Sequence, residues 1–123
     1  MAKPIKSLPI PNTDQIKALL EGRVYQLLKD YVAERVYDCR PYLTVKRRDI
    51  IEYLRAHPEA ALACFNRNKE QRKHVLHDIA KIEEYGEAYR VYWLDHGKPH
   101  SVHTFPSLAE ALAEFVLIDI GKY

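Results

Sequence analysis

A chain of 123 residues, of which 47% are hydrophobic and 29% charged, has the length and composition of one ordinary globular domain. It has no apolar run long enough for a membrane span and no signal-peptide-like N-terminus, so we expect a cytoplasmic protein with no membrane partner. The net charge of +2 is distributed unevenly: residues 40–81 hold ten Lys/Arg and five Asp/Glu, and the remainder holds nine and twelve. This sorting predicts one positive face, which suggests a polyanionic partner.

The N-terminal third predicts an extended arm and then one long helix. Residues 1–12 contain three prolines, which fix φ and disfavour helix in the preceding residue. Apolar residues then recur at helical spacing from Ile16 to Val32. We therefore expect a helix over residues 13–37.

The middle of the chain predicts three further helices. The first follows Thr44, and a short second one covers residues 59–65. After a polar turn over residues 66–68, Asn68 and Gln71 form a capping box for a helix over residues 69–85. This last helix has an apolar stripe on one side and a largely basic face on the other.

The C-terminal part predicts a β-hairpin followed by a helix. Residues 88–94 are rich in aromatic and β-branched types, residues 95–99 form a turn, and residues 100–105 return as the second strand. Ser107 caps a helix over residues 107–120 that is apolar on nearly all sides. Such a helix is buried in its own core or against another subunit.

Two runs of sequence resemble the winged helix-turn-helix DNA-binding domain. These are Ile50-Ile51-Glu52-Tyr53-Leu54 and the run from Val75 to Gly86 that precedes the aromatic hairpin. The resemblance covers residues 44–105. It implies an α+β fold, mainly helical with one β-hairpin, in a single domain over residues 13–123 with an added helix at each end. It also implies a small bacterial or phage transcription regulator.

In that family a recognition helix enters the major groove of double-stranded DNA, and the hairpin acts as a wing. The corresponding elements here would be the helix 69–85 and the hairpin 88–105. The helices over 13–37 and 107–120 would form a homodimer. The residues expected to contact nucleic acid are Arg47, Arg48, Arg67, Lys69, Gln71, Arg72, Lys73, His74, His77, Lys81, Arg90 and Lys98.

A different class of function is also compatible with these residues. Tyr and Trp are frequent in interface hot spots, and Tyr89, Tyr92 and Trp93 lie on the predicted hairpin. The alternative is therefore a non-enzymatic protein–protein interaction module, such as a small inhibitor, immunity or adaptor protein. It would dock through the aromatic hairpin or through the basic face.

The sequence gives little support for catalysis or for a cofactor. It has no glycine-rich phosphate loop, no Gly-x-Ser-x-Gly and no His-Glu-x-x-His, and its two cysteines are far apart. The histidines at 74, 77, 96, 100 and 103 are interpreted as surface residues, because a two-residue strand period places His100 and His103 on opposite faces. We expect no enzyme activity, no catalytic residues, no metal and no cofactor.

Overall fold

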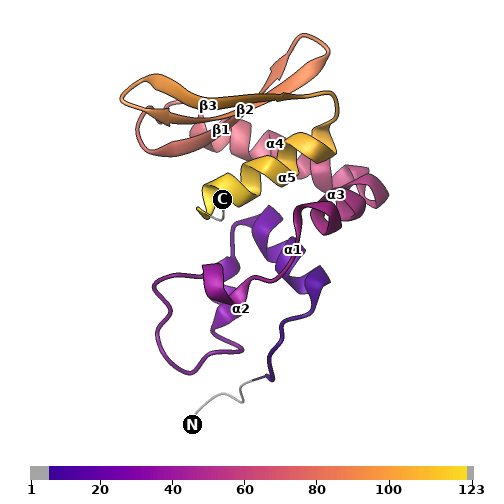
Figure 1. Ribbon diagram of the computed structural model, residues 1–123, viewed down its shortest axis with the longest axis vertical. Coiled ribbons are helices and arrows are strands. Elements are labelled where there is room, and N and C mark those ends of the chain that lie inside the picture. The colour runs from indigo at the N-terminus through magenta and orange to yellow at the C-terminus, as the bar shows by residue number, and fades with distance from the viewer. Residues whose placement is uncertain (1–5, 122–123) are drawn as a thin grey trace. The chain divides into compact units, whose positions relative to one another are not determined.

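The structure is a computed structural model that describes residues 6–121, so the arm expected over residues 1–12 is described only from Lys6 onward. Over these residues the chain is α+β (Figure 1), with five α-helices, one short 3-10 helix and a three-stranded sheet. The elements are α1 (Asn12–Glu21), α2 (Val24–Leu28), η1 (Arg40–Tyr42), α3 (Arg47–Ala56), α4 (Pro58–Arg72), β1 (Ile79–Tyr85), β2 (Ala88–Asp95), β3 (Lys98–Phe105) and α5 (Leu108–Asp119).

The chain forms two compact units, one up to Lys46 and the other from Arg47 onward. Over residues 6–121 we find no helix that combines the length and the apolar character needed to cross a bilayer.

The first unit contains two short helices where the sequence predicted one long helix over residues 13–37. Helix α1 ends because Gly22 adopts a left-handed conformation with φ 69°, and its N–H points back to the carbonyl groups of Ala18 and Leu19. Glycine takes this conformation without a Cβ penalty and commonly ends helices in this way. Helix α2 then stops at Leu28, so the prediction of a continuous helix is wrong.

A buried glutamine holds the first unit together. The side chain of Gln15 is fully buried, and its amide donates to the carbonyl of Ile10 at 2.8 Å and to Thr44 Oγ1 at 3.0 Å. Its Oε1 accepts from the backbone N–H groups of Thr44 at 2.9 Å and Val45 at 3.0 Å. The amide nitrogen of Gln15 thus donates two hydrogen bonds and its oxygen accepts two, as burial of an amide requires.

In the second unit, helix α3 confirms the helix predicted after Thr44, but α4 is longer than predicted. The expected turn over residues 66–68 lies inside α4. Asn68 continues the helix because its buried amide donates to the carbonyl of Cys64, four residues back, at 2.8 Å. Its Oδ1 accepts from Arg72 Nε at 3.0 Å. Because these hydrogen bonds satisfy the Asn68 side chain within the helix, it does not compete with the backbone hydrogen bonds of α4.

The predicted helix over residues 69–85 does not form. Helix α4 ends at Arg72, and residues 79–85 form strand β1, which pairs with β2 along its whole length from Ile79↔Leu94 to Tyr85↔Ala88. A spacing of three residues between Ile79 and Ile82 fits a helix stripe, but pairing with β2 along the whole segment and burial of Ala80 and Ile82 override that preference. The recognition helix of the winged-helix interpretation is therefore wrong. Residues 69–72 form the end of α4, residues 73–78 connect it to the sheet, and residues 79–85 form β1.

The three strands form an antiparallel sheet in the order β1-β2-β3. The hairpin predicted over residues 88–105 is confirmed as β2 and β3, joined through His96 and Gly97 with φ of 51° and 74°. A bulge with Ser101 at φ 53° shifts the register, so that His100 pairs with Trp93 and His103 with Val91. Because Trp93 and Val91 share a face, the two histidines also share a face, contrary to the simple alternation expected.

Helix α5 contributes more buried side chains to the second unit than any other element. Ser107 is its N-cap and accepts from the N–H of Glu110 at 3.3 Å, which confirms the predicted cap. The helix packs on α3 and on the strands, and both Leu112 and Phe115 are almost completely buried. Its apolar surface is therefore used within the chain, so it offers little to the homodimer expected through residues 107–120.

Candidate nucleic-acid interface

A pocket of about 190 Å³ lies between the end of α4 and strand β1. Four of its lining residues are cationic, and one, Glu83, is anionic. We call Lys69, Arg72, Lys73 and Lys81 the cationic pocket; the other lining residues are Asn68, Ile82, Glu83 and Tyr92. All four cations belong to the set that the sequence assigned to nucleic acid, but a helix and a strand bring them together, not one helix face.

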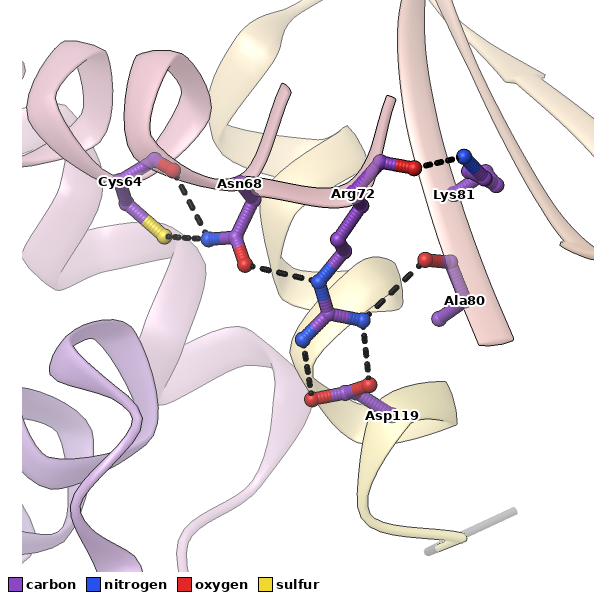
Figure 2. Close-up of polar contacts among 6 residues, drawn as sticks. All are labelled: Cys64, Asn68, Arg72, Ala80, Lys81 and Asp119. Atoms are coloured by element: carbon purple, nitrogen blue, oxygen red, sulfur yellow. Dashed lines mark hydrogen bonds and ion pairs between the residues drawn. The ribbon is translucent and has the colours of Figure 1, made fainter. Parts of the chain in front are cut away.

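Arg72 holds the pocket in place (Figure 2). Its two terminal nitrogens lie 2.7 Å and 3.0 Å from the carboxylate oxygens of Asp119, and Nη1 also donates to the carbonyl of Ala80 at 3.2 Å. Its guanidinium carbon lies 4.9 Å from the centroid of the Phe115 ring. Four of the five N–H donors of an arginine are thus used, counting the bond to Asn68. Arg72 thus joins α4, β1 and α5; Asp119 balances its charge, and one N–H donor remains.

Lys81 closes the C-terminal end of α4. Its Nζ donates to the backbone carbonyl of Arg72 (Figure 2), a position where a cation also interacts favourably with the helix dipole. Burial lowers the pKa of Lys81, and the neighbouring charge of Arg72 lowers it further. The positive charges of Lys81 and Arg72 repel each other, and an anion in the pocket would relieve that repulsion.

The two other lysines of the pocket are exposed and loosely paired. Lys69 Nζ lies 3.2 Å from Glu84, and Lys73 Nζ lies 2.8 Å from Glu70, with all four side chains at least half exposed. Surface pairs of this type are worth about 0–1 kcal/mol. Both lysines can therefore turn toward an anion at little cost.

The one carboxylate of the pocket is held by two partners. Glu83 lies 3.3 Å from Arg90, and it forms a hydrogen bond with the hydroxyl of Tyr92. Burial, and then this hydrogen bond, raise the pKa of Tyr92 to about 12. The negative charge of Glu83 is thus offset locally by Arg90. Neither Glu83 nor the acidic partner Asp119 was expected from the sequence to belong to the site.

Arg47 has a structural partner rather than a free guanidinium. It forms an ion pair with Glu114, whose side chain is only 1% exposed. The other carboxylate oxygen of Glu114 lies 2.6 Å from Nδ1 of His103, which donates to it. This chain of contacts ties α3, α5 and β3 together. A buried carboxylate needs such partners, and it fixes Arg47 away from the cationic pocket.

The remaining residues expected to contact nucleic acid are not part of the pocket lining. Those that are exposed are Arg48, Gln71, His74, His77 and Lys98, whereas Arg67 and Arg90 are half-buried. The ring centroid of His77 lies 5.3 Å from that of His96, and the two ring planes are inclined at 67°. The sequence thus found the cations but could not tell which of them converge.

The three aromatic residues of the alternative interface do not form one surface. Tyr89 and Trp93 alternate with Tyr92 along β2, so Tyr92 lies on the opposite face of the sheet. Tyr89 packs edge-on against Phe65 of α4, at 5.7 Å between ring centroids. This arrangement contradicts a shared aromatic patch.

The described residues contain no group of three or more His, Cys, Asp or Glu side chains that could hold a metal ion. Cys39 and Cys64 are both buried and reduced. Burial raises the pKa of the Cys64 thiol, which keeps it protonated and unreactive.

Comparisons with family models, with curated proteins and with solved structures find no match for this chain.

Proposed function

We propose that the second unit binds nucleic acid through the sugar–phosphate backbone, with a phosphate group in the cationic pocket. The observation that carries the proposal is the convergence of four cationic side chains on a pocket with one carboxylate. Phosphate contacts from Lys and Arg supply most of the affinity in non-specific nucleic-acid binding.

The geometry of the pocket suits a phosphate. Arg72 offers one rigidly held N–H donor, and Lys69 and Lys73 are exposed and can adjust. A charge-assisted hydrogen bond from arginine to a phosphate oxygen is strong, and lysine acts as a mobile point charge. Lys81 supports the site from the strand side. We expect this binding to occur in the cytoplasm and, on duplex DNA, to serve transcription regulation without a recognition helix over residues 69–85.

The test is a fluorescence-anisotropy titration with labelled oligonucleotides at about 50 mM and 200 mM salt. Affinity should fall steeply with salt, and Lys69→Gln/Lys73→Gln should reduce the slope of log K against log salt by about 1.4 to 1.8. The matched control is Lys17→Gln/Lys29→Gln, which removes two exposed lysines from the first unit. No salt-dependent binding, or an equal loss in the control, would overturn the proposal.

A protein partner is the second candidate function. Val75 and Leu76 are 39% and 53% exposed in the segment between α4 and β1. Exposed apolar side chains next to each other favour docking to another protein. The same titration separates the candidates, because this one predicts no salt-dependent binding to oligonucleotides.

A further inference from the structure

The sheet of the second unit has one face that no helix of that unit covers within the described residues. Helices α4 and α5 lie on the same side of the sheet (Figure 1), and they pack on Ala80, Ile82 and Val91, which are at most 5% exposed. Lys81 and Tyr92 form a cross-strand pair on the other face. The uncovered face therefore carries Lys81, Arg90 and Tyr92, with the apolar pair of Ile79 and Leu94 at the end near the turn between β2 and β3.

Three side chains form a continuous row on that face. The guanidinium carbon of Arg90 lies 4.5 Å from the ring centroid of Tyr85 and 5.7 Å from that of Tyr92. Tyr85 is 54% exposed. We call Tyr85, Arg90 and Tyr92 the aromatic row. Because Tyr92 also lines the cationic pocket, the row runs directly to the pocket.

The aromatic row contains an unused donor. Arg90 Nε is buried and has no hydrogen-bond partner among the described residues. Its guanidinium is instead held by Glu83 at 3.3 Å and by the two rings. Arg90 thus holds the two rings together, and the exposed ring of Tyr85 offers a planar surface on which another planar group can stack.

We infer that the aromatic row stacks the unpaired bases of single-stranded nucleic acid, while the cationic pocket holds a phosphate of the same strand. This inference rests on the proposed function. Aromatic rings and arginine planes stack on bases only when the bases are splayed out of a duplex, since paired bases hide their faces. Residues 90 and 92 are about 7 Å apart along the strand, wider than the ~3.4 Å step of a duplex strand, which favours an extended single strand.

The test compares Tyr85→Ala with Tyr85→Phe in the full chain. The matched control is Tyr37→Ala, because Tyr37 is also exposed and has an arginine, Arg35, at 5.1 Å from its ring. The probes are a labelled oligothymidine of about 12 nucleotides, an abasic strand of the same length and a duplex. Circular dichroism of each variant verifies the fold.

We expect Tyr85→Ala to weaken oligothymidine binding between about 5-fold and 150-fold, as loss of one base–aromatic stack does. Tyr85→Phe should stay within about 2-fold of the wild type, because it keeps an aromatic ring at position 85. Tyr37→Ala should also stay within about 2-fold, because Tyr37 is not part of the aromatic row. The abasic strand and the duplex should bind Tyr85→Ala as they bind the wild type.

Two results would overturn the inference, and they are distinguishable. If Tyr85→Ala binds oligothymidine normally while Lys69→Gln/Lys73→Gln weakens it, the phosphate site stands and base stacking falls. If the wild type binds no oligonucleotide at either salt concentration, the proposed function falls and the inference falls with it.

Discussion

The ion pair between Arg47 and Glu114 should respond very differently to the loss of each partner. Glu114 is 1% exposed, whereas the side chain of Arg47 is 41% exposed. Arg47→Gln leaves a carboxylate buried without its guanidinium. Glu114→Gln leaves a half-exposed arginine that water can solvate, and the new amide oxygen can still accept from His103.

The structure sets the magnitude of this asymmetry. Removing one partner of a buried pair costs about 3–5 kcal/mol, and we expect about 3 kcal/mol for Arg47→Gln because His103 still faces Glu114. Glu114→Gln should cost about 1 kcal/mol, the value of one net hydrogen bond, because the cation that remains is partly hydrated. The free energy of unfolding of the two variants should thus differ by about 2 kcal/mol.

Urea unfolding followed by far-ultraviolet circular dichroism measures this difference. At about 4 °C per kcal/mol, the midpoints of thermal unfolding should fall by about 12 °C for Arg47→Gln and about 4 °C for Glu114→Gln. The control is Arg48→Gln, an exposed neighbour, which should stay within about 0.5 kcal/mol of the wild type. An equal or larger cost for Glu114→Gln would refute the reasoning.

Two further predictions concern Tyr92 and Asn68. The pKa of Tyr92 is about 12 in the folded state and about 10 when unfolded, so its contribution to stability is complete below pH 10 and is lost as the pH rises toward 12. The ultraviolet titration of tyrosinate in Tyr92→Phe should lose amplitude near pH 12, and an unchanged amplitude there would contradict this assignment. Asn68→Ala removes the bonds to Cys64 and Arg72 and should cost about 1–3 kcal/mol in urea unfolding, whereas Asn66→Ala, at an exposed position of the same helix, should be nearly neutral.

Elements with local start and stop signals were predictable from the sequence. The helix after Thr44, the hairpin of β2 and β3, and the Ser107 cap of α5 all rest on residues close together in the chain. Strand β1 was not predictable from its own apolar spacing. A signal was nevertheless present, since Gly86 and Glu87 make a two-residue connection between strands.

The charge of the site was also visible in the sequence, but its geometry was not. Lys69, Arg72, Lys73 and Lys81 were all expected to contact nucleic acid on one helix face. The structure places Lys81 on a strand and engages Arg72 with Asp119, which is 47 residues away in the chain. No local pattern encodes a partner at that distance.

The sequence by itself determined the α+β composition, the excess of cations over residues 40–81 and the position of the turn between β2 and β3, because these depend on residue type and on neighbours in the chain. Only the tertiary structure decided that residues 79–85 form a strand, that α4 continues through Asn68 and that Arg47 serves a buried carboxylate. The physical reason is the same in each case. Backbone pairing and burial of polar groups depend on partners far apart in the chain, and their free energy exceeds the weak local preference of a short segment.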